Sequence, residues 1–457
     1  MISCVMMNIH AALFCGGALL LAFVFARQRD VPSEERRKNS DFDEHVTLEG
    51  AERALHWRYI FGYLPAIFGD WLIGGHLYAL YASYGYSMKQ IGILYIVGYA
   101  SSATLGTVAS AMLDGRKGCL AHCAFYVAAC LCLEFPQNFA ILCAGRCFGG
   151  VGTSLLYASF ESWVLQEHAR LGMREEALQN LYSACTVYSA LSAIAAGLIA
   201  EAAVVFTGSL LTPFRLALAP LAIGACVISV HWKSTSKRAT KENSSLASAF
   251  ADISNVARQV ALSPAVRSIC LLAAVFESCM FIFVSFWTPF LQSRLGNASS
   301  LRHGVVFSLF MLFKMCGSYL FSLLKGRMLQ GNIASRLIVI VFVSAAIFLF
   351  IPSMVVSSYE WSLTSYCLYE ICIGMYWPLI ASLRSQILTK SLVHKFISLF
   401  RIPLNGIVIS SIYLVSDASR GGAGNFVVAC CSFFLASVGL VAKEPIKKFY
   451  SSKVILG

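Results

Sequence analysis

Charged residues are scarce in this sequence of 457 residues. Asp, Glu, Lys and Arg make up 13% of it, whereas a soluble domain carries about 25%. Apolar residues make up 58%, and the mean hydropathy is +0.70. This composition disfavours a soluble multidomain enzyme. It is instead enough to supply about thirteen segments of about 20 residues, the length that crosses a bilayer, so we expect a polytopic helical membrane protein.

Sequence motifs of enzymes and of metal sites are also missing. The chain has no His-Glu-x-x-His pattern, no glycine-rich phosphate loop after a strand and no nucleophile elbow. Most of the 17 cysteines lie inside apolar runs, where thiols pack as small hydrophobic groups. Cys119, His122 and Cys123 resemble a metal site only in composition. We therefore expect no enzymatic activity, no catalytic residue, no cofactor and no bound metal.

Thirteen apolar segments follow one another along the chain. One precedes a pair of arginines, and the other twelve form two sets of six. The segments cover residues 9–26, then 58–82, 91–112, 119–135, 139–164, 178–203 and 212–232, then 266–291, 302–324, 334–352, 360–385, 396–417 and 423–442.

These segments predict five parts of the chain. An anchor helix with its cytosolic connection covers 1–57, and six-helix halves cover 58–232 and 266–442. A cytosolic linker covers 233–265, and a cytosolic tail covers 443–457. Apolar residues recur at helical spacing within the linker, which fits either an amphipathic helix on the membrane surface or a solvated loop helix.

Basic residues indicate the orientation in the membrane. The chain has 35 Lys and Arg against 23 Asp and Glu, and 28 of the 35 fall on alternate connections between the apolar segments. Because Lys and Arg accumulate in cytosolic loops, we expect the linker inside the cell and the residues before 9 outside. The clusters form no continuous basic stripe, so the expected partner is the lipid bilayer and not a nucleic acid.

Ionisable residues at membrane depth are the main functional signal, because each is costly unless it faces protein or water. The four acids among them fall on the first, fourth, seventh and tenth of the twelve core segments. These charges either neutralise one another as buried pairs or line a water-filled path. The full set is Asp70, Arg146, Glu161, Glu277, Lys314, Glu370, Arg384 and, near a segment end, Arg401.

The fourth and tenth segments share a weak internal repeat. Arg146 and Gly150 are four residues apart in one, and Glu370 and Gly374 are four apart in the other, with the charge reversed. On ideal helices Arg146 shares a face with Glu161, and Glu370 shares a face with Arg384. A stripe of small residues predicts that the second segment packs closely on a neighbour. Its members are Gly98, Ser102, Gly106 and Ser110.

Two halves of six segments, a basic linker and charges on segments one, four, seven and ten together resemble the major facilitator superfamily. Gly145, Arg146, Gly150 and Gly152 are similar to its fourth-helix motif. Longer strings resemble one branch, the molybdate-anion transporter family, whose eukaryotic members carry an extra N-terminal helix. These strings include Asp70-Trp71-Leu72, Phe160-Glu161-Ser162-Trp163, Phe276-Glu277-Ser278, Gly374-Met375-Tyr376-Trp377-Pro378 and Phe400-Arg401-Ile402-Pro403-Leu404-Asn405. Lys314 departs from the family pattern and either alters affinity or pairs with Glu277.

The resemblance implies an all-α membrane protein with the major facilitator fold, two six-helix halves and one extra N-terminal transmembrane helix. It also implies a secondary active transporter that imports molybdate or a similar tetrahedral oxyanion by alternating access, with protons as a candidate coupling ion. Cations and hydrogen-bond donors suit such an anion. The residues expected to bind it are Arg146, Arg384, Arg401 and Asn405, and those expected to relay charge are Asp70, Glu161, Glu277 and Glu370.

We further expect a monomer in the plasma membrane. Two alternatives remain open at this point. One is a major facilitator carrier of another small solute. The other is a membrane sensor or scaffold that keeps the fold without transport, because a fold does not fix a function.

Overall fold

The computed structural model describes most of the chain as helix. The described residues are 2–29, 42–113, 115–233, 263–295, 300–324, 331–355, 358–387, 404–415 and 423–456, and within them there is no strand. Arg401 and most of the linker, including its predicted amphipathic helix, lie outside these ranges.

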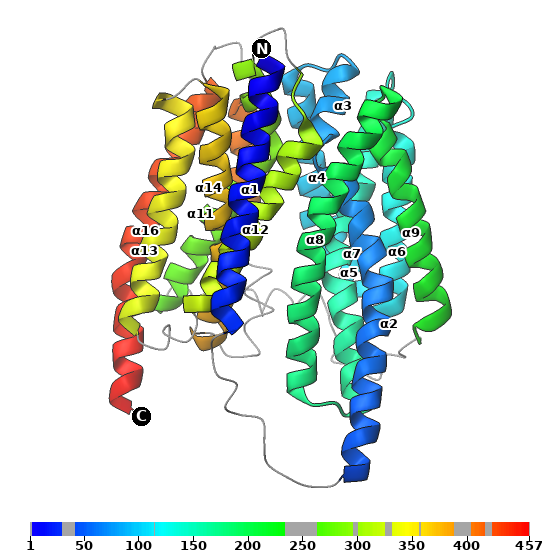
Figure 1. The fold of residues 1–457 in the computed structure, drawn as a ribbon, viewed down its shortest axis with the longest axis vertical. Coiled ribbons are helices and arrows are strands. Elements are labelled where there is room, and N and C mark those ends of the chain that lie inside the picture. The colour runs from blue at the N-terminus through cyan, green and yellow to red at the C-terminus, as the bar shows by residue number, and fades with distance from the viewer. Residues whose placement is uncertain are drawn as a thin grey trace. The chain divides into compact units, whose positions relative to one another are not determined.

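The chain divides into two compact units. We call Val31–Arg238 with Arg302–Ser308 the N-half unit, and Met1–Asp30, Ala239–Leu301 and Leu309–Gly457 the C-half unit. The helices of the N-half unit are α2 (Phe42–Gly74), α3 (Leu77–Ser83), α4 (Met88–Ala103), α5 (Leu105–Met112), α6 (Gly115–Cys132), α7 (Phe139–Leu171), α8 (Glu175–Thr207) and α9 (Thr212–His231) (Figure 1).

The C-half unit holds the extra N-terminal helix and the second set of helices (Figure 1). They are α1 (Ile2–Arg29), α11 (Pro264–Leu295), α12 (His303–Leu324), α13 (Gly331–Phe350) with the π-helical turn η2 (Ile351–Val355), α14 (Tyr359–Ile387) and α16 (Ala423–Leu456). A short apolar helix at Leu404–Val415 belongs to the same unit. The first residues of α12, up to Ser308, are grouped with the N-half unit.

Nine helices of the described residues are long and apolar enough to cross a membrane. The other predicted segments are also mostly helical in the residues that the structure describes. The prediction of an all-helical membrane protein is therefore confirmed.

Several helix boundaries differ from the apolar segments. The predicted segment 58–82 is interrupted, because α2 ends at Gly74 and α3 begins at Leu77. Two consecutive glycines at this point weaken a helix. In contrast, α8 continues past its apolar segment to Thr207 and ends at Gly208, whose φ of +70° fits a left-handed cap. Apolar runs mark membrane depth, whereas helix ends depend on caps and breaks.

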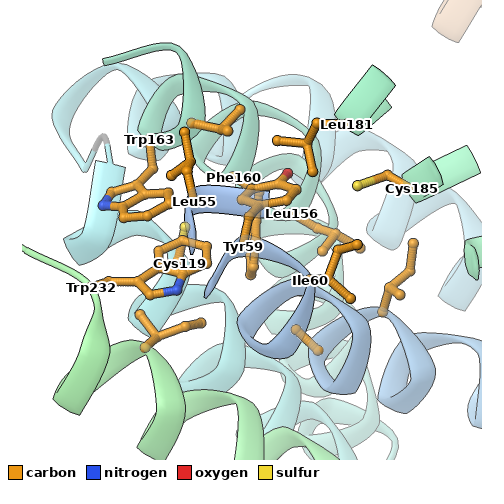
Figure 2. Packing of buried hydrophobic residues seen from close by; sticks show 14 of the residues in the cluster. Leu55, Tyr59, Ile60, Cys119, Leu156, Phe160, Trp163, Leu181, Cys185 and Trp232 are labelled. Atoms are coloured by element: carbon orange, nitrogen blue, oxygen red, sulfur yellow. The ribbon is translucent and has the colours of Figure 1, made fainter. Parts of the chain in front are cut away.

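An aromatic cluster lies among the buried hydrophobic residues of the N-half unit (Figure 2). The rings of Trp163 and Trp232 stack with centroids 3.8 Å apart, and Tyr59 stacks on both. Both indole N–H groups are satisfied: Trp163 donates to the Lys233 carbonyl at 3.2 Å, and Trp232 donates to the Arg58 carbonyl at 3.1 Å. The cluster therefore fixes α2, α7 and α9 against one another with large buried rings whose polar groups are paired.

The extra helix α1 packs on α12 and α14 of the C-half unit. His10 Nε2 lies 2.9 Å from the Tyr359 hydroxyl in a buried hydrogen bond. Cys316 donates from Sγ to the Gly17 carbonyl at 3.4 Å. A Cβ at Gly17 would lie 2.8 Å from the Leu312 side chain, so the small residue permits close approach.

Candidate functional site

Asp70 of α2 is hydrogen bonded to a phenol from a neighbouring helix. The hydroxyl of Tyr126 on α6 donates to Asp70 Oδ1, and it lies 2.9 Å from the Thr153 hydroxyl on α7. No cation among the described residues forms an ion pair with Asp70. The acid of the first core helix is thus stabilised by a neutral donor, and its charge is not cancelled by a fixed base.

Arg146 of α7 reaches across to α4. Its Nε donates to the Leu94 carbonyl at 3.3 Å, and its guanidinium carbon lies 5.3 Å from the centroid of the Tyr95 ring. A Cβ at Gly98 would lie 2.6 Å from Arg146 Nη2, so glycine makes room for the guanidinium. No described carboxylate forms an ion pair with Arg146. The N-half unit therefore presents one cation at membrane depth that lacks an acidic partner among the described residues.

Glu161, the second charged residue predicted on α7, is exposed. Its charge acts on Tyr182 of α8. The structure does not bring Glu161 to the α4 contacts that surround Arg146, although the two residues were expected to share a helix face. An offset of about 60° over four helical turns is enough to separate a side chain that faces a neighbouring helix from one that faces outward.

Glu277 of α11 is buried and bound from two positions on α14. Tyr376 donates to Glu277 Oε1 at 2.8 Å, and Arg384 Nη2 donates to the same oxygen at 3.2 Å. The Phe276 ring stacks on Tyr376 with centroids 4.0 Å apart. The suggested pairing of Lys314 with Glu277 is therefore wrong for this structure, because Arg384 occupies that role.

Glu370 of α14 is 3% exposed, and its Oε2 has no hydrogen-bond partner among the described residues. The cation whose charge acts on it is Lys314 of α12. Lys314 keeps part of its surface exposed. The described residues of the C-half unit thus contain one of these acids in direct contact with a base, Glu277 with Arg384, and a second acid, Glu370, that the charge of Lys314 reaches without an ion-pair contact.

The contact between α12 and α14 repeats the contact between α4 and α7. A Cβ at Gly374 would overlap the Lys314 carbonyl and lie 2.9 Å from the Ser318 amide. A Cβ at Gly150 would overlap the Gly98 carbonyl and lie 3.0 Å from the Ser102 amide. The four-residue spacing is the same in both halves.

This repeat assigns equivalent positions to the charged residues. Because Gly374 corresponds to Gly150, Glu370 stands where Arg146 stands in the other half. By the same spacing, Lys314 stands where Gly98 stands. The charge reversal seen in the sequence is accompanied by an added base on the facing helix.

The remaining predicted binding residues are placed only in part. Asn405 lies in the first turn of the helix Leu404–Val415 and is partly exposed. The carbonyl of its neighbour Leu404 accepts a hydrogen bond from Ser278 of α11 at 3.3 Å. This contact places Asn405 near the helix that carries Glu277, while Arg401 lies outside the described residues.

Sequence reasoning missed the phenols that bind the acids, because a tyrosine inside an apolar run looks like a core aromatic. It also missed Glu201, near the end of α8. The Gly304 amide donates to Glu201 Oε2 at 2.9 Å, and His76 Nε2 lies 3.6 Å from the same oxygen. The His76 and His303 rings are 5.7 Å apart. A count of acids near each segment end could have identified Glu201 as a candidate.

Helices long and apolar enough to cross a bilayer that carry acids and bases at membrane depth are typical of membrane transporters. Residues 36–369 match the family MFS_5, described as sugar transporters with 12 transmembrane segments. The chain belongs to this family of major facilitator proteins. It is therefore a multi-pass membrane transporter and not an enzyme, as the sequence indicated.

Curated relatives and solved structures agree with this assignment. Molybdate-anion transporters of Xenopus tropicalis and Xenopus laevis are each 28% identical over 400 residues, which cover 85% of this chain and 85% of each relative. The molybdate-anion transporter of Danio rerio is 28% identical over 405 residues, with 83% of both chains covered. The resemblance drawn from the sequence strings is thus confirmed.

Among solved structures, a point mutant of the nucleoside transporter NupG aligns with a TM-score of 0.63 at 12% identity, covering 86% of this chain and 99% of that chain. The peptide transporter POT in complex with sulfate aligns with a TM-score of 0.65 at 13% identity, covering 85% and 93%. At this identity the two structures show the fold alone, which is the predicted major facilitator fold.

Proposed function

We propose that this chain is a secondary active transporter that imports molybdate or a similar tetrahedral oxyanion by alternating access. The observation that carries the proposal is Arg146, a cation at membrane depth without a carboxylate partner among the described residues. An uncompensated charge at this depth is costly, and a substrate anion would relieve that cost. The molybdate-anion transporters similar to this chain supply the candidate substrate.

A tetrahedral dianion accepts charge-assisted hydrogen bonds on all its oxygens. Arg146 offers a planar guanidinium whose remaining donors are compatible with such an ion. In the C-half unit we assign anion contacts to Arg384, Arg401 and Asn405, with Arg384 shared between the anion and Glu277. Arginine suits this role because it stays charged in a partly desolvated site.

Proton coupling follows from the charge of the substrate. A dianion entering a cell with a negative interior is opposed by roughly 2.3 kcal/mol per charge per 100 mV, or about 4.6 kcal/mol for two charges. Asp70 is our candidate proton carrier, because it is not in direct contact with a base among the described residues. Glu277, held by Arg384 and Tyr376, would relay charge between the cation and the path. We leave Glu161 out of the relay because it is exposed.

We propose the plasma membrane as the site of uptake and the monomer as the working form. The second candidate function is a carrier of neutral sugars, which the description of the matched family favours. Uncompensated charge at Arg146 argues against it, since a neutral sugar cannot replace a counter-ion.

Competition for uptake by reconstituted protein tests the substrate. We expect labelled molybdate to enter proteoliposomes, tungstate to compete strongly, sulfate to compete to a degree set by selectivity, and glucose to have no effect. Glucose uptake without molybdate uptake would instead support the sugar carrier. Uptake of neither would contradict transport of both substrate classes.

Substitution of Asp70 tests the coupling. We expect Asp70→Asn to lose molybdate accumulation driven by an inward proton gradient and to keep exchange of molybdate for molybdate, because exchange needs no net proton movement. Tyr126→Phe, which removes the donor to Asp70 but keeps the acid, is the matched control and should retain accumulation with a changed pH profile. Unchanged accumulation in well-folded Asp70→Asn protein would exclude Asp70 as a carrier.

A further inference from the structure

Glu370 is held differently from Glu277, the other buried acid of the C-half unit. Glu277 has two donors on one oxygen, a phenol and a guanidinium, and both come from α14. Glu370 is buried, yet its Oε2 has no partner among the described residues. A buried carboxylate oxygen without a donor is costly to keep. A purely structural ion pair would be expected to satisfy it.

The second observation is the register between α12 and α14, which places Lys314. Gly374 packs against the backbone of Lys314 and Ser318 as Gly150 packs against Gly98 and Ser102. Ser318 donates to the Gly374 carbonyl at 3.0 Å, which holds α12 and α14 in this register. Lys314 therefore corresponds to Gly98, the residue against which the Arg146 guanidinium packs in the other half.

The third observation is the difference in exposure between Lys314 and Glu370. Lys314 keeps part of its surface accessible, while Glu370 is almost fully buried. A lysine ammonium is a compact point charge on a flexible stem, so it can swing between an internal carboxylate and an external anion. A change of partner would therefore involve a rotation of the Lys314 side chain.

From these three observations we infer that Lys314 is an anion-contacting residue of the C-half unit, masked in the empty protein by Glu370. The inference rests on the proposed oxyanion transport and adds a specificity-determining residue to it. Glu370 competes with the substrate for Lys314, so the pair sets how strongly the site prefers a doubly charged anion. A dianion outcompetes one internal carboxylate, whereas a monoanion gains less from Lys314.

The preference for doubly over singly charged anions distinguishes an anion-contacting Lys314 from a Lys314 that only stabilises the fold. The probes are molybdate and perrhenate, tetrahedral oxyanions of charge two and one, offered to reconstituted protein. Because hydrogen bonds to charged groups are individually strong, we expect Lys314→Gln to raise the KM for molybdate by about tenfold or more. The KM for perrhenate should change far less. Glu370→Gln should lower the KM for molybdate, because Lys314 is then unmasked.

The double variant Lys314→Gln with Glu370→Gln decides between the two roles. If Glu370 acts by masking Lys314, the double variant should transport like Lys314→Gln alone. If the pair only stabilises the fold, the double variant should recover wild-type KM values. Glu134→Gln with Arg215→Gln, which removes an exposed ion pair of the N-half unit, is the matched control and should leave both KM values unchanged.

Two outcomes overturn the inference: an unchanged ratio of the two KM values in Lys314→Gln, which means equal losses for both anions, or recovery of wild-type KM values in the double variant. Thermal unfolding of each purified variant identifies any loss that comes from misfolding. If the proposed oxyanion transport itself is wrong, the wild-type protein will carry neither molybdate nor perrhenate, which distinguishes that failure from failure of the Lys314 inference.

Discussion

At the scale of single residues, the acids of the two halves are stabilised in different ways. Asp70 accepts a hydrogen bond from a phenol, whereas Glu277 accepts one from a phenol and another from a guanidinium. A carboxylate that shares a buried ion pair cannot be neutralised without leaving an unpaired cation. This asymmetry makes Glu277 the more structural of the two acids.

We expect Glu277→Gln to destabilise the C-half unit by about 3–5 kcal/mol, because the largely buried Arg384 loses the charge of Glu277. Tyr376→Phe removes a single neutral donor and should cost only about 1 kcal/mol. Thermal unfolding of the purified variants in one detergent measures which of the two substitutions costs more stability. Equal midpoints for Glu277→Gln and the wild type would show that the ion pair contributes nothing to stability.

Outside the membrane segments, hydrogen bonding from Arg174 holds the pKa of Glu52 below its ordinary value. A lowered pKa in the folded state adds stability above the pKa of the unfolded chain, and this stability is lost as the pH falls through the folded value. The pair is partly exposed, so we expect Glu52→Gln to cost less than about 1 kcal/mol at neutral pH.

That difference between Glu52→Gln and the wild type should disappear in acid. Unfolding midpoints of both proteins at neutral and at strongly acidic pH test the sign. A difference that grows as the pH falls would contradict the effect of Arg174 on Glu52.

At the scale of helices, glycines set which elements can approach each other. A Cβ at Gly374 would overlap the Lys314 carbonyl, which is backbone and cannot move aside cheaply. We expect Gly374→Ala to separate α12 from α14 and to lower the unfolding midpoint markedly. Gly406→Ala is the matched control in the same half, because nothing described lies within 4 Å of its Cβ position.

Alanine favours a helix over glycine, so Gly406→Ala should be neutral or slightly stabilising. Circular dichroism during heating measures both variants. A Gly374→Ala protein as stable as Gly406→Ala would show that the close contact is not required.

The helices themselves could be predicted from the sequence, because the length and polarity of a run decide whether it can cross a bilayer. The side chains that pair with the charged residues could not be predicted from the sequence. Spacing on one helix suggests which residues share a face, but it does not say which neighbouring helix that face meets. Arg384 was recognised as a membrane-depth base, yet its pairing with Glu277 depends on how α11 and α14 pack. The alternative in which Lys314 pairs with Glu277 fails for the same reason, because Arg384 forms the ion pair with that acid.

At the scale of the whole molecule, the chain is a major facilitator transporter with an additional N-terminal helix docked on its C-half unit. Each half carries acids and bases at membrane depth. Among the described residues, Arg384 of the C-half unit forms an ion pair with Glu277, whereas Arg146 of the N-half unit forms none. The proposed oxyanion transport depends on this residue more than on any other described one.

The most direct test is molybdate uptake into proteoliposomes that contain equal amounts of wild-type, Arg146→Ala or Arg215→Ala protein. Arg215 is the matched control, since it forms an exposed ion pair with Glu134. We expect Arg146→Ala to lose most uptake at limiting molybdate and Arg215→Ala to keep the wild-type rate. The reason is that Arg146 has no described carboxylate partner, whereas Arg215 is paired with Glu134. Wild-type uptake by a well-folded Arg146→Ala protein would contradict the role of this arginine in anion transport.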